Sequence, residues 1–137
     1  MGTEILLPTD GTEQAIERIE RALDLASDKD ASVHALYVVD TQRYGEPALS
    51  SVEVLIDNFE DKGRDHLASL VAQGQRKGVH IEGQCRHGDP AEEIVEAADE
   101  LAVDLVVPCL VQVTPRQLLR KGLDRDRITD VASPMTA

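Results

Sequence analysis

The chain has 137 residues, 42% of them hydrophobic, which suits one compact domain with a single core over residues 1–137. It carries 26 Asp and Glu against 14 Lys and Arg, and this net charge of −12 argues against binding to nucleic acid or to anionic membranes. No apolar run approaches the roughly 18 residues of a membrane span, and no signal-peptide pattern opens the chain, so we expect a soluble, cytoplasmic protein.

Strand and helix patterns alternate from the start of the chain. Residues 4–8 form a short apolar run typical of a buried strand, and Thr12 is placed to act as the N-cap of the helix that follows. This helix is predicted from apolar residues that recur at helical spacing, namely Ala15, Ile16, Ile19, Ala22, Leu23 and Ala26. Residues 32–39 are apolar almost without interruption and predict a strand buried on both faces, which ends at Asp40.

The middle of the chain repeats the pattern of strand and helix. After a loop at 41–49, Ser50 and Glu53 have the spacing of a capping box and open a long helix with apolar positions up to Val71. Residues 79–86 alternate weakly between apolar and polar side chains, as in a strand at the edge of a sheet.

The last third of the chain supplies the remaining elements. Asp89 as N-cap and Pro90 at the first helical position predict another helix. A buried strand follows at 105–107, then a weakly helical stretch at 116–132 and a short strand at 134–137. Because helices separate all the strands, we predict a doubly wound α/β fold, with a parallel sheet and helices on both faces.

Candidate ligand-binding residues follow the strands, because open α/β sheets bind ligands at the carboxyl ends of their strands. Asp10 follows the first strand and can accept a ribose hydroxyl or hold a cation; alternatively, it is an anion that interacts with a helix N-terminus. Gly88 either lets the backbone approach a ligand or serves turn geometry alone.

Four motifs in the same order resemble the universal stress protein family. They lie at 5–12, 33–40, 87–98 and 102–107, so the resemblance covers residues 4–107. It implies an adenine nucleotide alpha hydrolase-like fold with a five-stranded sheet of order 3-2-1-4-5, and a homodimer made through the last strand. It also implies that, in the members that bind ATP, the residue matching Asp10 contacts the ribose and metal-bound phosphates, while backbone near Val39 holds the adenine. Other members bind no ATP.

The chain departs from the family at the phosphate motif, which reads Gly-x2-Gly-x9-Gly-[Ser/Thr] in ATP-binding members. Pro108-Cys109 stands where the fourth strand continues into Met-Gly, Gln112 and Pro115 match loop glycines, and Gly122-Leu123 lacks the hydroxyl. Glycine lets such a loop adopt positive φ and bring its amides close to phosphate oxygens. Losing several of these hydrogen bonds, at about 1.5–3 kcal/mol each, predicts ATP affinity weaker by orders of magnitude.

A basic cluster in this acidic chain offers a substitute for the missing loop. Its members are Arg116, Arg120, Lys121, Arg125 and Arg127. Guanidinium groups can replace backbone contacts to phosphate, which would make the cluster a site for an anion or an acidic partner. The alternative is a solvated helix face whose charges pair with Asp124, Asp126 and Asp130.

The sequence predicts neither a catalytic site nor a metal site. Its four histidines have no ligand spacing, and no nucleophile elbow, Walker loop or pair of carboxylates is present. Cys85 and Cys109 lie in apolar runs, where we expect buried free thiols rather than a disulfide or redox pair.

We therefore predict a non-catalytic stress-response or regulatory protein that lacks high-affinity ATP binding and needs no cofactor. It would act as a homodimer or through an unidentified protein partner. One alternative is a regulator that binds ATP or another adenine nucleotide, or a weak ATPase, in which Asp10 and the basic cluster replace the glycine loop. Another is an unrelated α/β domain that binds a small molecule. The vestigial or weak nucleotide site would comprise Pro8, Thr9, Asp10, Val38, Val39, Gly88, Arg116 and Gly122.

The acidic composition also predicts a halophilic character. Only four lysines are present beside ten arginines. Carboxylates stay hydrated in concentrated salt, which also screens their mutual repulsion. We therefore expect the chain to be more stable in molar salt than in dilute buffer.

Overall fold

The structure is a computed structural model that describes residues 2–40, 49–110 and 112–131, with backbone only for residues 49–59. Its strands are β1 (Glu4–Thr9), β2 (Ser32–Asp40), β3 (Ile81–Gly88) and β4 (Leu105–Val106). Its α-helices are α1 (Ile16–Lys29), α2 (Leu49–Lys77), α3 (Pro90–Glu100) and α4 (Pro115–Arg120). The described 3-10 helices are η1 (Glu13–Ala15) and η3 (Arg125–Arg127).

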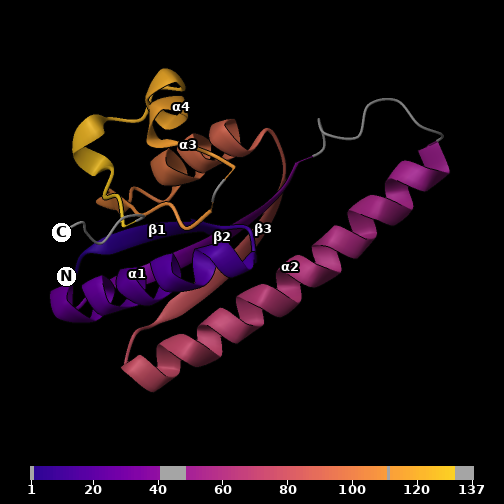
Figure 1. The fold of residues 1–137 in the computed structure, drawn as a ribbon. Coiled ribbons are helices and arrows are strands. Elements are labelled where there is room, and N and C mark those ends of the chain that lie inside the picture. The colour runs from indigo at the N-terminus through magenta and orange to yellow at the C-terminus, as the bar shows by residue number, and fades with distance from the viewer. Residues whose placement is uncertain (1, 41–48, 111, 132–137) are drawn as a thin grey trace.

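The described strands form one parallel sheet in the order β3-β2-β1-β4 (Figure 1). Parallel neighbours need crossover connections, and the helices of these crossovers cover both faces of the sheet. Helices α1 and α2 pack on one face, and α3 and α4 pack on the other. The predicted doubly wound α/β class is confirmed, and β3 lies at the sheet edge, as its weak alternation predicted.

The prediction of five strands in the order 3-2-1-4-5 is wrong for the described residues, which form four. Residues 134–137, where the fifth strand was expected, lie outside them. On the outer side of β4, the described chain makes an isolated parallel bridge between Val106 and Ile128. The Thr129 N–H donates to the Val106 carbonyl at 2.9 Å, and this short contact is what the described residues place beside β4.

The predicted helix at 116–132 is also wrong in its length. Helix α4 ends at Arg120, because Gly122 adopts φ of +105° and turns the chain. The Leu123 N–H then donates back to the Leu118 carbonyl at 3.0 Å, which satisfies the end of the helix. The chain continues through η3 and is extended at Ile128.

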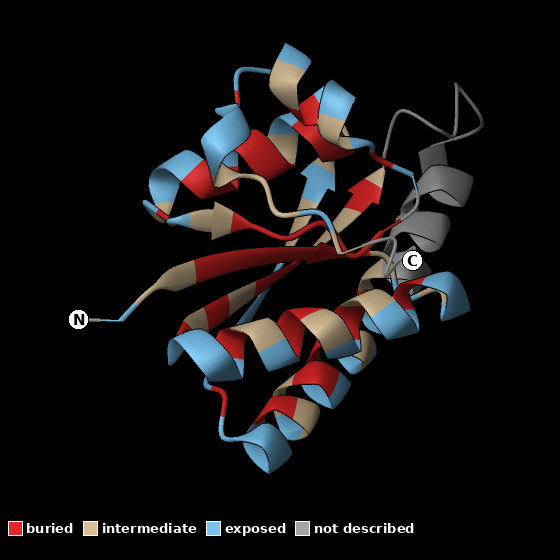
Figure 2. Cartoon of the chain, turned by 60° about the vertical axis from the view of Figure 1, so that its left-hand side comes forward, coloured by how far each residue is buried: buried red, intermediate tan, exposed pale blue. Residues whose placement is uncertain are grey.

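Two apolar cores fill the space between the sheet and its helices, as the layers of buried residues in Figure 2 show. The side chains of β1 alternate between them: Ile5 and Leu7 pack with α1 and α2, while Leu6 packs with α3 and α4. All three are fully buried. Such a strand must be apolar at consecutive positions, which explains the short apolar run in the sequence.

Glycines bring helix α2 close to the sheet. A Cβ atom at Gly63 would lie 2.6 Å from Tyr37 Cδ1, and one at Gly74 would lie 2.5 Å from Ile81 Cδ1.

Helix α2 begins at Leu49, one residue before the predicted N-cap at Ser50, and the side chains of the expected capping box lie outside those described.

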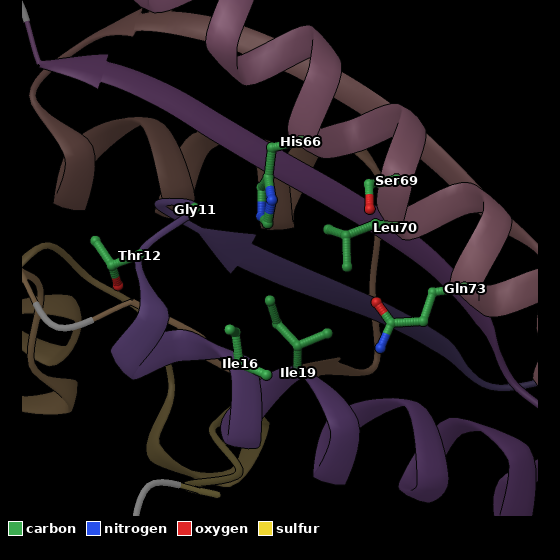
Figure 3. Close-up of a pocket in the computed structure, with 8 residues that line it drawn as sticks. All are labelled: Gly11, Thr12, Ile16, Ile19, His66, Ser69, Leu70 and Gln73. Atoms are coloured by element: carbon green, nitrogen blue, oxygen red, sulfur yellow. The ribbon is translucent and has the colours of Figure 1, made fainter.

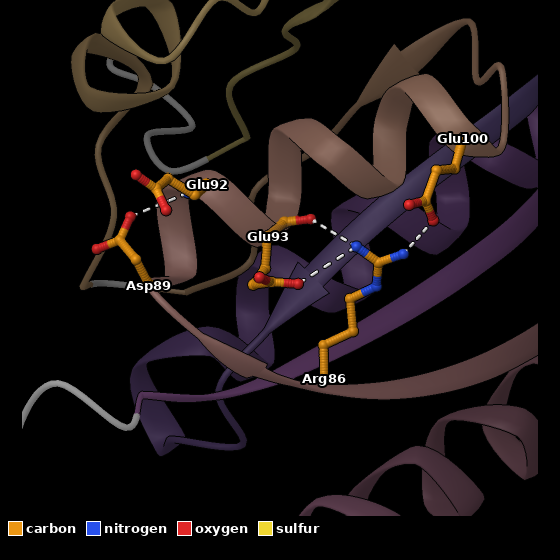
Figure 4. Close-up of polar contacts among 5 residues, drawn as sticks. All are labelled: Arg86, Asp89, Glu92, Glu93 and Glu100. Atoms are coloured by element: carbon orange, nitrogen blue, oxygen red, sulfur yellow. Dashed lines mark hydrogen bonds and ion pairs between the residues drawn. The ribbon is translucent and has the colours of Figure 1, made fainter.

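Helix α3 begins as the sequence predicted. The Asp89 carboxylate accepts a hydrogen bond from the Glu92 N–H at 3.0 Å, and Pro90 occupies the first turn. Figure 4 shows that Arg86, from β3, reaches the Glu93 carboxylate at 3.3 Å and also pairs with Glu100. These ion pairs connect the first turn and the last residue of α3 to the edge strand.

Candidate functional site

The end of β1 and the chain that follows β4 lie side by side. Thr9 forms a parallel bridge with Cys109, whose N–H donates to the Pro8 carbonyl at 2.8 Å. The structure therefore brings three of the predicted site residues, Pro8, Thr9 and Asp10, next to the segment that replaces the phosphate loop. This is the edge of the sheet where ligands bind in open α/β folds.

Asp10 is held by the turn that follows it. Its Oδ1 accepts hydrogen bonds from the Thr12 N–H at 3.0 Å and from the Thr12 hydroxyl at 2.8 Å. Thr12 takes the predicted N-cap position, at the start of η1, which leads directly into α1, but its hydroxyl is bonded to Asp10 and makes no capping hydrogen bond. A carboxylate that already accepts two hydrogen bonds has less capacity left for a ligand.

His66 is a member of this site that the sequence analysis missed. It projects from α2 and its Nε2 shares a 2.8 Å hydrogen bond with the Thr9 hydroxyl. Its ring packs edge-on against Tyr37, with ring centroids 6.3 Å apart. Burial lowers the pKa of His66, and the charge of Asp10 opposes part of this shift. The only sequence signal was its place beside Leu67 and Leu70 in the apolar stripe of α2.

The predicted residues of β2 and β3 lie farther along the same edge. Val39 is 2% exposed as a whole residue, so neither its side chain nor its backbone is open to a ligand to any large extent. Half-buried Val38 packs with the core on the side of α3 and α4. The register pairs Asp40 with Gly88. Gly88 has φ of +139°, and a Cβ there would lie 2.9 Å from a Glu93 carboxylate oxygen. Its conformation fits the turn into α3 without a ligand.

The segment from Leu110 to Leu123, here called the replacement segment, packs as part of the core. Its buried members join the cluster formed by α3 and the sheet: they are Leu110, Val113, Leu118 and Leu123. Helix α1 also contacts the start of the replacement segment, because the Arg18 guanidinium donates to the Leu110 carbonyl at 2.7 Å. A loop that wraps phosphates must expose its backbone amides, whereas this segment is anchored by apolar side chains.

The N-terminus of α4 uses its own side chains as hydrogen-bond partners. Gln117 Oε1 accepts from the Thr114 N–H at 2.8 Å, and the Thr114 hydroxyl accepts from the Gln117 N–H at 3.3 Å, which makes a capping box. Pro115 has no N–H to donate. The amides of Thr114 and Gln117 are therefore already satisfied, and residue 115 offers none to an anion.

Two members of the basic cluster, Arg127 and Lys121, form ion pairs with α3. Arg127 pairs with Asp99 at 3.1 Å and donates to the carbonyls of Ala98 and Val103 at 3.0 Å each, which satisfies the end of α3. Lys121 pairs with Glu92 at 3.0 Å. The remaining arginines are exposed and make no ion pair to another described side chain: they are Arg116, Arg120 and Arg125.

Both cysteines are free thiols, as predicted. Burial raises the pKa of Cys109 to about 12, and burial also raises the pKa of the partly buried Cys85. Neither is a thiolate at neutral pH, so neither is an activated nucleophile. Within the described ranges, no group of three or more His, Cys, Asp or Glu side chains could hold a metal, and no helix has the length and apolarity that a membrane crossing requires.

The Universal stress protein family model matches residues 1–108. A universal stress protein of Methanocaldococcus jannaschii is 35% identical over 105 residues, which cover 76% of this chain and 62% of that protein. One of Methanothermobacter thermautotrophicus is 34% identical over 110 residues, covering 78% of this chain and 75% of that protein. The chain thus spans less than two thirds of the length of the first relative.

Solved structures show the same fold. A crystal structure of a universal stress protein family member from Burkholderia pseudomallei superposes with a TM-score of 0.81 at 28% identity and covers 96% of each chain. A universal stress protein from Archaeoglobus fulgidus was solved in complex with dAMP; it has a TM-score of 0.68 at 13% identity, and 95% of this chain and 97% of that chain are covered. An Arabidopsis thaliana member with AMP bound has a TM-score of 0.65 at 15% identity, with 93% and 90% covered.

Proposed function

We propose, on the premise that this chain belongs to the universal stress protein family, that it is a non-catalytic stress-response protein without high-affinity ATP binding. It acts through association with other proteins, first of all with a second copy of itself. No cofactor is required for this function.

The packing of the replacement segment carries the proposal. Within this segment, Leu118 is fully buried and Leu123 is 3% exposed. The capping box of Thr114 and Gln117 uses the amides at the start of α4. Remodelling this segment around a triphosphate would expose apolar side chains, at about 1.5–3 kcal/mol for each large one.

The outer side of β4 supports self-association. Among the described residues, a single bridge to Ile128 pairs with this side of the strand. A strand edge with unpaired backbone groups is a template for another chain. Light scattering on the full chain and on a variant that ends at Ser133 tests this part: we expect a dimer that the truncation dissociates, and an unchanged mass would remove the tail from the interface.

A second candidate is a regulator that binds an adenine nucleotide, or a weak ATPase. It is favoured by Asp10 at the end of β1 and by Arg116 and Arg120, which are exposed and make no ion pair to another described side chain. The structural neighbours that hold dAMP and AMP make a nucleotide at this edge of the sheet a reasonable ligand to test. In this candidate, guanidinium groups supply the phosphate contacts that the glycine loop lacks.

ATP calorimetry, with mass spectrometry of the purified protein for bound nucleotide, separates the two candidates. The first predicts no saturable ATP binding below millimolar concentration in the native chain or in Asp10→Ala. Sub-millimolar binding that Asp10→Ala and Arg116→Ala abolish would contradict it and support the second. Asp28→Asn, which removes a charge from the distant end of α1, is the control for a general effect of charge.

A further inference from the structure

A cleft of about 310 Å³ lies between α1 and α2, on the face of the sheet opposite the replacement segment (Figure 3). It opens beside Gly11 and Thr12, directly after the end of β1. Cavities of about 150 Å³ are large enough for benzene, so this cleft has room for a ring with a polar substituent. Its volume lies at the lower end of the range for small-molecule sites, about 300–1,000 Å³.

Apolar side chains from both helices line part of the cleft. Ile19 and Leu70 are 3% and 1% exposed and form its floor, while Ile16 is 52% exposed at its rim. Helical spacing predicted that Ile16 would be buried with the other members of the α1 stripe. Instead it is the one large apolar side chain that the described part of the surface exposes to this degree. A ligand in the cleft would cover it.

Beside Leu70, helix α2 also presents polar side chains to the cleft. His66, Ser69 and Gln73 follow one another at positions i, i+3 and i+7 of α2, and Figure 3 shows them directed towards α1. Ser69 and Gln73 make no side-chain hydrogen bond to another described residue. His66 uses Nε2 in its bond with Thr9, so Nδ1 is left for a ligand. The cleft therefore combines apolar side chains from both helices with hydrogen-bonding side chains of α2.

The lining carries no formal charge. Among the side chains that the structure describes, no Asp, Glu, Lys or Arg lines the cleft, although 29% of the chain is charged. His66 is neutral at pH 7 because burial lowers its pKa. A charged ligand would lose hydration here without gaining an ion pair from the lining, and this cost favours uncharged molecules.

We propose that the cleft between α1 and α2 is a binding site for an uncharged small molecule that has an apolar ring and an amide-like hydrogen-bonding edge. The ring packs on Ile16, Ile19 and Leu70, and the edge exchanges hydrogen bonds with Ser69, Gln73 and His66 Nδ1. The cleft adjoins the candidate site at the end of β1 and shares His66 with it, but its lining does not include Thr9 or Asp10, and the proposal does not require ATP to bind.

Three probes of the same shape test the proposal, with binding followed by amide chemical shifts of the ¹⁵N-labelled full chain at pH 7.5. Benzamide is neutral, benzoate is an anion and benzamidine is a cation. We expect saturable shifts with benzamide at Gly11, Ser69 and Gln73, and an affinity for each charged probe that is about tenfold lower or less. Equal affinities for the three probes, or shifts that map elsewhere, would overturn the proposal.

Two matched variants on α2 locate the site. Ser69→Phe fills the cleft and should weaken benzamide binding about tenfold or more, since the ring of the variant occupies the ligand's place. Ala68→Phe adds the same ring at the adjacent exposed position, which does not line the cleft, and should leave binding unchanged. Both substitutions are at exposed positions, and thermal melts verify that the variants fold. Loss of binding in both, or in neither, would refute this location.

Discussion

Leu118→Ala tests whether the replacement segment is part of the core. Leu118 is 0% exposed and packs in the cluster with α3, whereas its neighbour Leu119 is only half-buried. Truncating a fully buried leucine removes its transfer free energy and leaves a cavity, which costs about 2–5 kcal/mol. Leu119→Ala removes the same atoms from a half-buried position and should cost about 1 kcal/mol or less.

The magnitude is easily measured. A domain of this size has an unfolding free energy of about 5–15 kcal/mol, so the substitution removes a large part of it. At about 4 °C per kcal/mol, Tm should fall by about 8–20 °C. Urea unfolding followed by circular dichroism gives the free energy directly, and an unchanged m value would show that the unfolding transition stays the same.

A small effect would refute the reasoning. If Leu118→Ala costs as little as Leu119→Ala, the segment contributes little to the core and is free to rearrange around a ligand. An ATP titration of the same two variants gives a second check of the reasoning. We expect no gain of affinity in either, because the capping box at Thr114 and the missing N–H of Pro115 are unchanged.

Three further predictions concern charge and close packing. Burial lowers the pKa of His66 below 6.5 in the folded protein, so the unfolded chain binds a proton at this residue more readily. The free energy of unfolding should therefore fall as pH drops below about 6.5. Urea titrations at several pH values should show a shallower fall in His66→Gln. Gly74→Ala places a Cβ 2.5 Å from Ile81 Cδ1 and should cost about 1–3 kcal/mol, with partial recovery in the double variant with Ile81→Val; a neutral Gly74→Ala would contradict the close approach. Melts should show Tm rising from dilute buffer to molar salt, and a Tm indifferent to salt would end the halophilic interpretation.

Local rules explain why the sequence predicted the first strand and the start of α3. The residues of β1 are apolar on both faces, and this pattern does not depend on which helix covers them. The cap at Asp89 involves an N–H only three residues away, so it needs no partner from elsewhere. The family motifs are likewise contiguous segments, so the resemblance to the family does not depend on long-range contacts.

Two residues whose roles the sequence did not predict, His66 and Arg127, have partners far along the chain. His66 became part of the site through Thr9, which lies 57 residues earlier. Arg127 had been considered for an anion site, but the end of α3 takes up its donors 24 to 29 residues away. Neither contact leaves a periodic signal, because each is made by a single side chain that meets another element after the fold has formed.

Composition, periodicity and local capping by themselves determined that this chain is an acidic α/β protein with a parallel sheet, and that glycines are missing where a phosphate loop would lie. Only the tertiary structure decided what replaced that loop: a segment whose leucines fill the core beneath α3, and a cleft on the other face where Ile16 stays exposed. Periodicity marks which side chains are apolar, but the crossing of helices over the sheet decides which of them find a neighbour.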